Sequence, residues 1–150
     1  MHPPPETMRI VHLAALALWG GMVLAEAVVE LVPLSRRELL QPGADFHYYI
    51  DLCVEIPLLS LVVATGALNL LSVPITALLL VKLSAAAVAV AAQVACVVLV
   101  VRRHRLAGAP APALDALHRR IIACALVGVP FALAAAAIGL YISTTLLAVG

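Results

Sequence analysis

The sequence predicts an all-α integral membrane protein, a four-helix antiparallel bundle whose helices span the bilayer. Three observations favour this class. Only 11% of the 150 residues are charged and 65% are hydrophobic, whereas a soluble domain carries about 25% charged residues. The mean hydropathy is +1.14. Four apolar runs each reach the roughly 20 residues that a helix needs to cross the hydrocarbon core.

The apolar runs divide one transmembrane domain, residues 1–150, into four spans. The predicted spans are residues 9–32, 47–71, 75–101 and 121–149. Three connections join them: a short loop over 33–46, a tight turn over 72–74 and a flexible polar connector over 104–118. Because short connections join neighbouring helices, the spans are expected to run up, down, up and down.

Arginines gather in two of the three connections. Arg36 and Arg37 lie in the first connection. Five more lie in or beside the third: Arg102, Arg103, Arg105, Arg119 and Arg120. The positive-inside rule therefore predicts that these connections are cytoplasmic, and that both termini lie on the outer, periplasmic side of the cell inner membrane. A net charge of +1 predicts no nucleic acid partner.

The second and fourth spans share a spacing of proline and glycine. Gly66 follows Pro57 by nine residues, as Gly139 follows Pro130. Each proline removes one backbone donor, which kinks a helix. The shared spacing is compatible with chance and also with an old duplication of a helical hairpin.

Five ionisable side chains fall inside the predicted spans: Glu26, Glu30, Asp51, Glu55 and Lys82. A charge in hydrocarbon costs a few kcal/mol even on permissive insertion scales. Polar groups that survive in a span usually face the bundle interior and serve a function. These five residues are therefore expected to hold an ion, a proton path or a cofactor.

Acidic residues and histidines are predicted to meet near the cytoplasmic boundary. Glu26 and Glu30 end the first span, and His47, Asp51 and Glu55 begin the second at four-residue spacing. Two further histidines, His104 and His118, lie at the same mouth. Three interpretations stay open: ion pairs with the nearby arginines, a proton route, or a divalent metal held by oxygen and nitrogen ligands.

A second polar group is predicted in the outer half of the bundle. His12 and Trp19 are seven residues apart on one face of the first span, and Lys82 falls at the depth of His12. A neutral His12 imidazole could ligate haem iron, and Lys82 could bind a propionate, act as a base or be a second iron ligand. Alternatively, His12 is a hydrogen-bonded structural residue and Lys82 reaches water along its stem.

The motifs resemble those of the HemJ-type protoporphyrinogen oxidases and the CopD-like (copper-resistance protein D) membrane proteins. The first span, RIVHLAALALWGGMVL, resembles that family's first helix, and ITALLLVKLSAAAVAV resembles the helix with its key lysine. The resemblance implies haem b with His12 as axial ligand, Trp19 and Lys82 at the cofactor, and Lys82 as the residue required for oxidation of protoporphyrinogen. Gln93 stands where the oxidases carry a histidine.

Together these observations favour a small haem-b-binding redox protein that oxidises a porphyrinogen-type substrate or passes electrons to a quinone or a partner protein. The catalytic candidates are Lys82, Glu26 and Glu55. His12 is the candidate ligand of haem iron, and the candidates for a second, unidentified metal are His47, Asp51, Glu30, His104 and His118. Two alternatives stay open: handling of copper or another divalent metal, and a non-catalytic subunit of a homo-oligomer or larger membrane complex.

Overall fold

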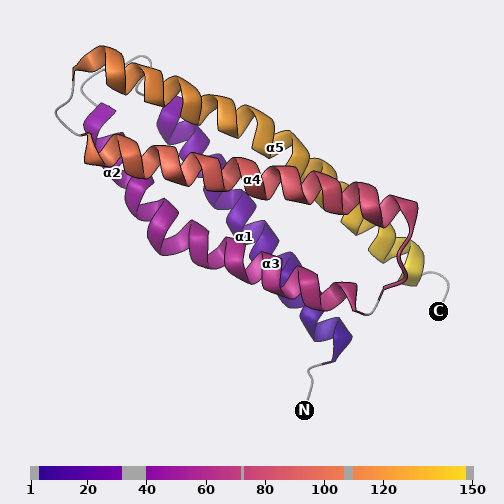
Figure 1. The fold of residues 1–150 in the computed structure, drawn as a ribbon. Coiled ribbons are helices and arrows are strands. Elements are labelled where there is room, and N and C mark those ends of the chain that lie inside the picture. Colours follow the sequence, from indigo (N-terminus) through magenta and orange to yellow (C-terminus); the bar gives the residue numbers. More distant parts are fainter. Residues whose placement is uncertain (1–3, 32–39, 72, 107–109, 148–150) are drawn as a thin grey trace.

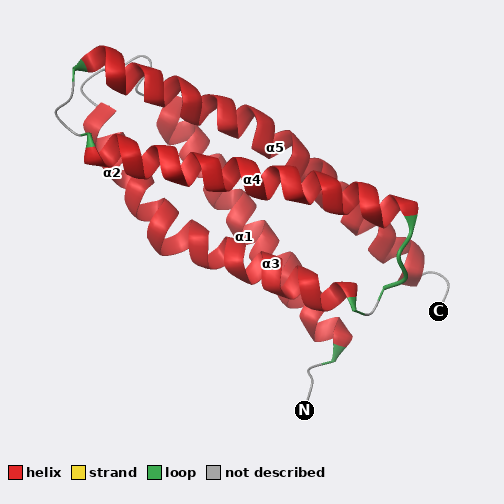
Figure 2. Cartoon of the chain, in the orientation of Figure 1, coloured by secondary structure: helices red, strands yellow, loops and turns green. Residues whose placement is uncertain are grey.

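The computed structural model describes residues 4–31, 40–71, 73–106 and 110–147, and they are helical apart from short turns (Figure 2). The helices, in chain order, are α1 (Pro5–Leu31), α2 (Leu40–Ile50), the π-helical η3 (Asp51–Glu55), α3 (Ile56–Leu70), α4 (Ala77–Arg105) and α5 (Ala111–Leu147). Because α2, η3 and α3 follow one another without a break, the described chain forms four long rods (Figure 1).

Each rod is long and apolar enough to cross a membrane. The segments that meet this condition are Glu6–Val28, Gln41–Leu70, Ala77–Arg105 and Pro112–Thr145. The predicted class, an all-α bundle of four membrane-spanning helices, is confirmed. The chain is thus a multi-pass membrane protein whose apolar outer surface suits a lipid bilayer.

Three helices begin earlier than the sequence predicted, and α1 does so by four residues, at Pro5 rather than at residue 9. The second rod begins at Leu40 rather than at residue 47, and the fourth at Ala111 rather than at residue 121. Most of the connector predicted over 104–118 is therefore helical. Prolines explain the error, because Pro42 and Pro112 lie in first turns, where a helix needs no backbone donor from them. The predicted loop arginines Arg36 and Arg37 lie outside the described residues.

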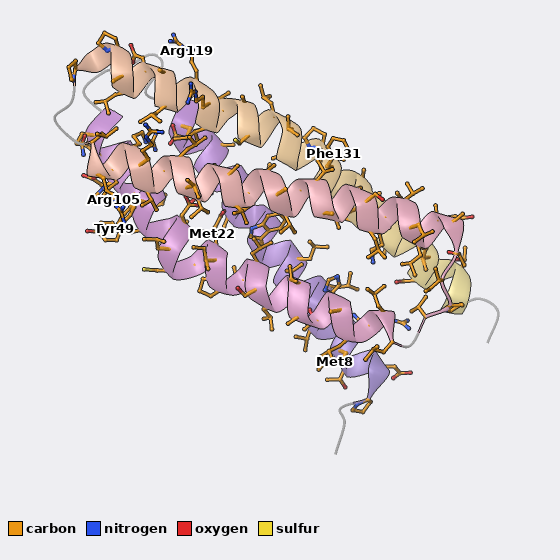
Figure 3. All side chains as sticks on the ribbon, in the orientation of Figure 1. Met8, Met22, Tyr49, Arg105, Arg119 and Phe131 are labelled. Carbon is orange, nitrogen blue, oxygen red and sulfur yellow. The ribbon has the colours of Figure 1, made fainter. Side chains whose placement is uncertain are left out.

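The rods form two antiparallel pairs, α1 with α3 and α4 with α5, and α2 also packs on α4 (Figure 1). We call the end where α4 finishes and α5 begins the basic end, and the other end, where both termini lie, the terminal end. Figure 3 shows Tyr49, Arg105 and Arg119 at the basic end and Met8 at the terminal end.

Close helix contact joins the second pair. A Cβ at Gly128 of α5 would lie 3.1 Å from Ala92 Cβ of α4, so the absent side chain lets the two backbones approach, as small residues do in membranes. Nearer the basic end, Cys96, Val100 and Ile121 form a buried apolar cluster between the same helices. These contacts hold α4 and α5 closely together.

Proline 57 produces a π-turn instead of a simple kink. It is the second residue of α3 and cannot donate a backbone hydrogen bond. Immediately before it, the Ile56 N–H donates to the Asp51 carbonyl, five residues back, and this closes η3. π-Turns are rare and often mark functional sites. Here the widened turn directs both Asp51 and Glu55 inward, and each is 0% exposed.

The two pairs bury corresponding positions. Every buried α1 residue has a buried α4 counterpart whose number is higher by 70: Ala15 and Ala85, Trp19 and Ala89, Glu26 and Cys96, Glu30 and Val100. The same offset relates His12, which lies against Gly66, to Lys82, which lies against Gly139. Residues spaced by four, seven and four positions lie on one face of a helix, so each helix buries one continuous stripe.

Candidate functional site

A buried group of polar side chains lies between the helices at the basic end. We call Glu26, Glu30, His47, Asp51 and Glu55 the carboxylate–histidine cluster. Helix α1 supplies the two glutamates Glu26 and Glu30, α2 supplies the histidine, and η3 supplies the remaining two acids. All five are buried. The sequence predicted this meeting of α1 with the second rod, and the structure brings these residues together.

Glu30 is the best-paired member of the cluster. Arg103 of α4 donates from Nη1 to Glu30 Oε2 at 3.0 Å and from Nη2 to Oε1 at 2.5 Å, the bidentate geometry of strong ion pairs. His118 Nδ1 of α5 lies 2.8 Å from Oε2, without the alignment of a hydrogen bond. Glu30 follows the apolar span that ends at Val28. Although burial raises the pKa of its carboxyl, hydrogen bonds from His47 and Arg103 lower that pKa to about 2, so Glu30 is a carboxylate at neutral pH.

His47 bridges this ion pair to the deeper acids. Its Nδ1 lies 2.5 Å from Glu30 Oε1, a short hydrogen bond. Its Nε2 faces Glu26 Oε2 at 3.2 Å and Asp51 Oδ2 at 3.7 Å. Neither contact of Nε2 has hydrogen-bond geometry. One nitrogen of the ring is thus fixed by a carboxylate, while the other points between two more.

Several buried atoms of the cluster lack a hydrogen-bond partner within the described part of the chain: Glu26 Oε1, His47 Nε2, both Asp51 carboxylate oxygens and Glu55 Oε1. Leaving a buried polar atom unpaired costs about 1–3 kcal/mol, and more if it is charged. Among the residues that the structure describes, Arg103 is the arginine that contacts the cluster, and it does so through Glu30. The cluster therefore needs bound protons or a cation to balance its charge.

Gln93 of α4 donates a hydrogen bond to Glu55 Oε2, and it is the donor that the structure gives to this carboxyl. We expect Gln93→Leu to lower the free energy of unfolding by about 1–3 kcal/mol, because it leaves a buried acceptor without its donor. Unfolding of the purified protein in mixed micelles measures this change. Combining Gln93→Leu with Glu55→Leu should restore most of the loss, and a double variant no more stable than Gln93→Leu alone would contradict the pairing.

His104, a candidate metal residue, lies apart from the cluster. Its Nδ1 is 3.2 Å from Asp45 Oδ1, and its ring stacks on Tyr48 with ring centroids 3.9 Å apart. His118 does reach the cluster, through Glu30. Sequence reasoning did not find the partners Asp45 and Tyr48, because nothing in the spacing of α2 relates them to the end of α4.

His12 occupies the terminal half of the α1–α3 pair. Its Nδ1 lies 3.0 Å from Thr65 Oγ1, and the Thr65 hydroxyl donates to the Leu61 carbonyl at 2.6 Å. Because that bond uses the only hydroxyl proton, Thr65 accepts from His12, so Nδ1 carries the ring proton and Nε2 keeps its lone pair. The ring lies against Gly66, where a Cβ would approach His12 Cε1 to 3.1 Å.

Lys82 and Trp19 complete the residues predicted for a cofactor. Lys82 lies against Gly139 of α5, where a Cβ would come within 3.1 Å of Nζ. No hydrogen bond or ion pair joins Lys82 to another residue that the structure describes. Trp19 is buried, and its indole N–H has no partner among the described residues. Within the described residues, the Lys82 ammonium and the Trp19 indole N–H thus have no hydrogen-bond acceptor.

Comparison of the chain with models of known families, with curated proteins and with solved structures found no match. The fold and the buried residues together define a class: a multi-pass membrane protein of four spanning helices with a carboxylate–histidine cluster at the basic end.

Proposed function

We propose that the protein is a small membrane redox protein that binds haem b with His12 as axial ligand. The observation that carries the proposal is the hydrogen-bond relay from His12 Nδ1 through Thr65 to the Leu61 carbonyl. A histidine that ligates a metal nearly always donates its other ring N–H to a fixed acceptor. His12 fits this requirement, because its Nε2 lone pair is the one left for iron.

The surroundings of His12 suit a planar ligand that carries negative groups. Gly66 removes the side chain that would otherwise press on the imidazole. The Lys82 ammonium has no anionic partner within the described residues, so it is available to a haem propionate. Trp19 is buried on α1, seven residues after His12. It offers an aromatic surface and an indole N–H that has no hydrogen-bond partner among the described residues. The family resemblance points to the same three residues.

Haem b, when bound, would exchange single electrons by cycling between ferric and ferrous iron. The protein's own residues would supply the rest of the chemistry. Lys82 would position or protonate the substrate, and Glu55 would hold and release protons at the basic end. A quinone, a porphyrinogen or a partner protein would accept or donate the electrons. We place this activity in the inner membrane, with the basic end in the cytoplasm, and the chain in a homo-oligomer or a larger membrane complex.

Visible absorption of protein purified after haem-supplemented expression tests the proposal. The parent is expected to show a Soret band, and His12→Ala to lose it. Thr65→Val should lower haem affinity about 10–100-fold, because it removes the acceptor that orients the ligand. His104→Ala is the matched control, a histidine outside this relay, and should keep the parent spectrum. Equal Soret intensity in the parent and in His12→Ala would contradict the assignment.

A further inference from the structure

We propose that Glu26, His47 and Asp51 form a binding site for one divalent first-row transition metal ion, separate from the haem proposed at His12. The three side chains come from α1, α2 and η3. Each offers one ligand atom, and these atoms lie within 4.8 Å of one another. The side chains belong to residues only 5%, 3% and 0% exposed, so they form an interior site rather than a surface group of acids.

The buried atoms of these residues that lack hydrogen-bond partners are suited to bind a cation. His47 Nε2, both Asp51 oxygens and Glu26 Oε1 are buried and have no hydrogen-bond partner among the described residues. Nε2 lies 3.2 Å from Glu26 Oε2 and 3.7 Å from Asp51 Oδ2, in neither case with hydrogen-bond geometry. Two ligands that are each about 2.1 Å from one metal lie about 3.0–3.4 Å apart, depending on coordination geometry. The contact with Glu26 already has this spacing, and the contact with Asp51 is slightly longer.

The residues behind His47 have the arrangement that supports a metal ligand. His47 Nδ1 is hydrogen-bonded to Glu30 at 2.5 Å, and a carboxylate on one ring nitrogen directs the other toward the metal. Arg103 and His118 hold that carboxylate in place. Glu30 is therefore a positioning residue paired with Arg103, while Glu26 and Asp51 supply the carboxyl oxygens for a cation.

The donor set indicates which ion would bind. One imidazole nitrogen with carboxylate oxygens suits Mn²⁺, Fe²⁺ or Zn²⁺, whereas copper(I) prefers sulfur ligands and Mg²⁺ or Ca²⁺ prefer oxygen alone. Glu55 lies four residues after Asp51 in η3, and its Oε1 has no hydrogen-bond partner in the described part of the chain. It is placed on the same helix face to serve as an additional ligand or to hold a metal-bound water.

Titration of the full-length, tag-free protein with Mn²⁺ alone, followed by electron paramagnetic resonance, tests the site. The parent, stripped by chelator, is expected to bind one Mn²⁺ per chain. Asp51→Asn and Glu26→Gln should each weaken binding at least 10-fold, and Glu30→Gln about 10–100-fold. Asp45→Asn is the matched control, an acid of α2 that contacts Gln41 and His104 instead, and should bind as the parent does.

A second measurement needs only the parent, so misfolding of a variant does not affect it. Electron spin echo modulation of bound Mn²⁺ should show one directly coordinated imidazole nitrogen. No saturable Mn²⁺ binding, no such nitrogen, or equal affinity in Asp51→Asn and the parent would each overturn the proposal. His12→Ala should retain Mn²⁺ binding, so a failure of the haem proposal and a failure of this one give different results.

Discussion

Arg103→Met is expected to lower the free energy of unfolding by about 3–5 kcal/mol. Removing one partner of a buried ion pair leaves the other charge uncompensated, and losses of this size are typical. Arg103 makes both hydrogen bonds of the fork that holds Glu30, and both side chains are buried. Methionine preserves the length and apolar stem of arginine, so the change chiefly removes the charge. Denaturation of the purified protein in mixed micelles measures the loss.

Arg102→Met is the matched control for this change. Arg102 precedes Arg103 on α4, but its side chain is exposed at the basic end, so its removal should change stability by less than about 0.5 kcal/mol. Adding Glu30→Gln to Arg103→Met should recover part of the loss, because the unpaired carboxylate is then gone. Equal effects of Arg102→Met and Arg103→Met would show that Glu30 does not depend on this ion pair.

Gly128→Ile is expected to destabilise the α4–α5 pair by about 3 kcal/mol, at the upper end of the usual cost of overpacking. Even the first atom of the new side chain would lie 3.1 Å from Ala92 Cβ and 3.9 Å from the Ala89 carbonyl oxygen. The backbones of α4 and α5 must therefore separate to admit the remaining atoms. The same unfolding measurement detects this effect, and a lower yield of monodisperse protein would accompany it.

The control is Gly21→Ile in α1. A Cβ at Gly21 meets no atom within 4 Å, and replacing a helix-interior glycine improves helix propensity by a few tenths of a kcal/mol to 1 kcal/mol. We therefore expect unchanged or slightly higher stability. If Gly128→Ile were as stable as Gly21→Ile, the close approach of α4 and α5 would be wrong.

The fold class followed from the sequence because membrane spans are long and uniformly apolar, so that no single residue decides them. Helix ends were harder to predict. Pro42 and Pro112 indicated connections, yet each lies in the first turn of a helix, where proline is tolerated. The π-turn at Asp51–Glu55 was not predictable either, since Pro57 is equally compatible with a kink.

The composition of the candidate site was predictable to a similar extent. Four-residue spacing on α2 and η3 and on α1 was enough to bring His47, Asp51 and Glu55 to the glutamates of α1. Spacing within one helix says nothing about partners from other helices, so the roles of Arg103 and Gln93 required the structure. The hydrogen bond of Thr65 to His12 likewise depends on how α1 packs against α3.

The two groups of polar residues lie at different positions along the bundle. The relay through His12 lies in the terminal half, and the carboxylate–histidine cluster lies at the basic end. The two helix pairs differ in what they bury near the basic end. Helix α1 buries Glu26 and Glu30 there, whereas α4 buries Cys96 and Val100 at the corresponding positions. The acidic residues of the cluster thus lie on α1 and η3, while α4 contributes Arg103, which pairs with Glu30.

Reduction of the purified parent protein with dithionite, followed by its visible spectrum and its iron content, tests the proposed function most directly. The account predicts about one haem per chain, with a Soret band that shifts on reduction and sharp α and β bands of the b type that His12→Ala lacks. A parent protein that is folded and monodisperse after haem-supplemented expression, yet has no Soret band and no iron, would contradict it.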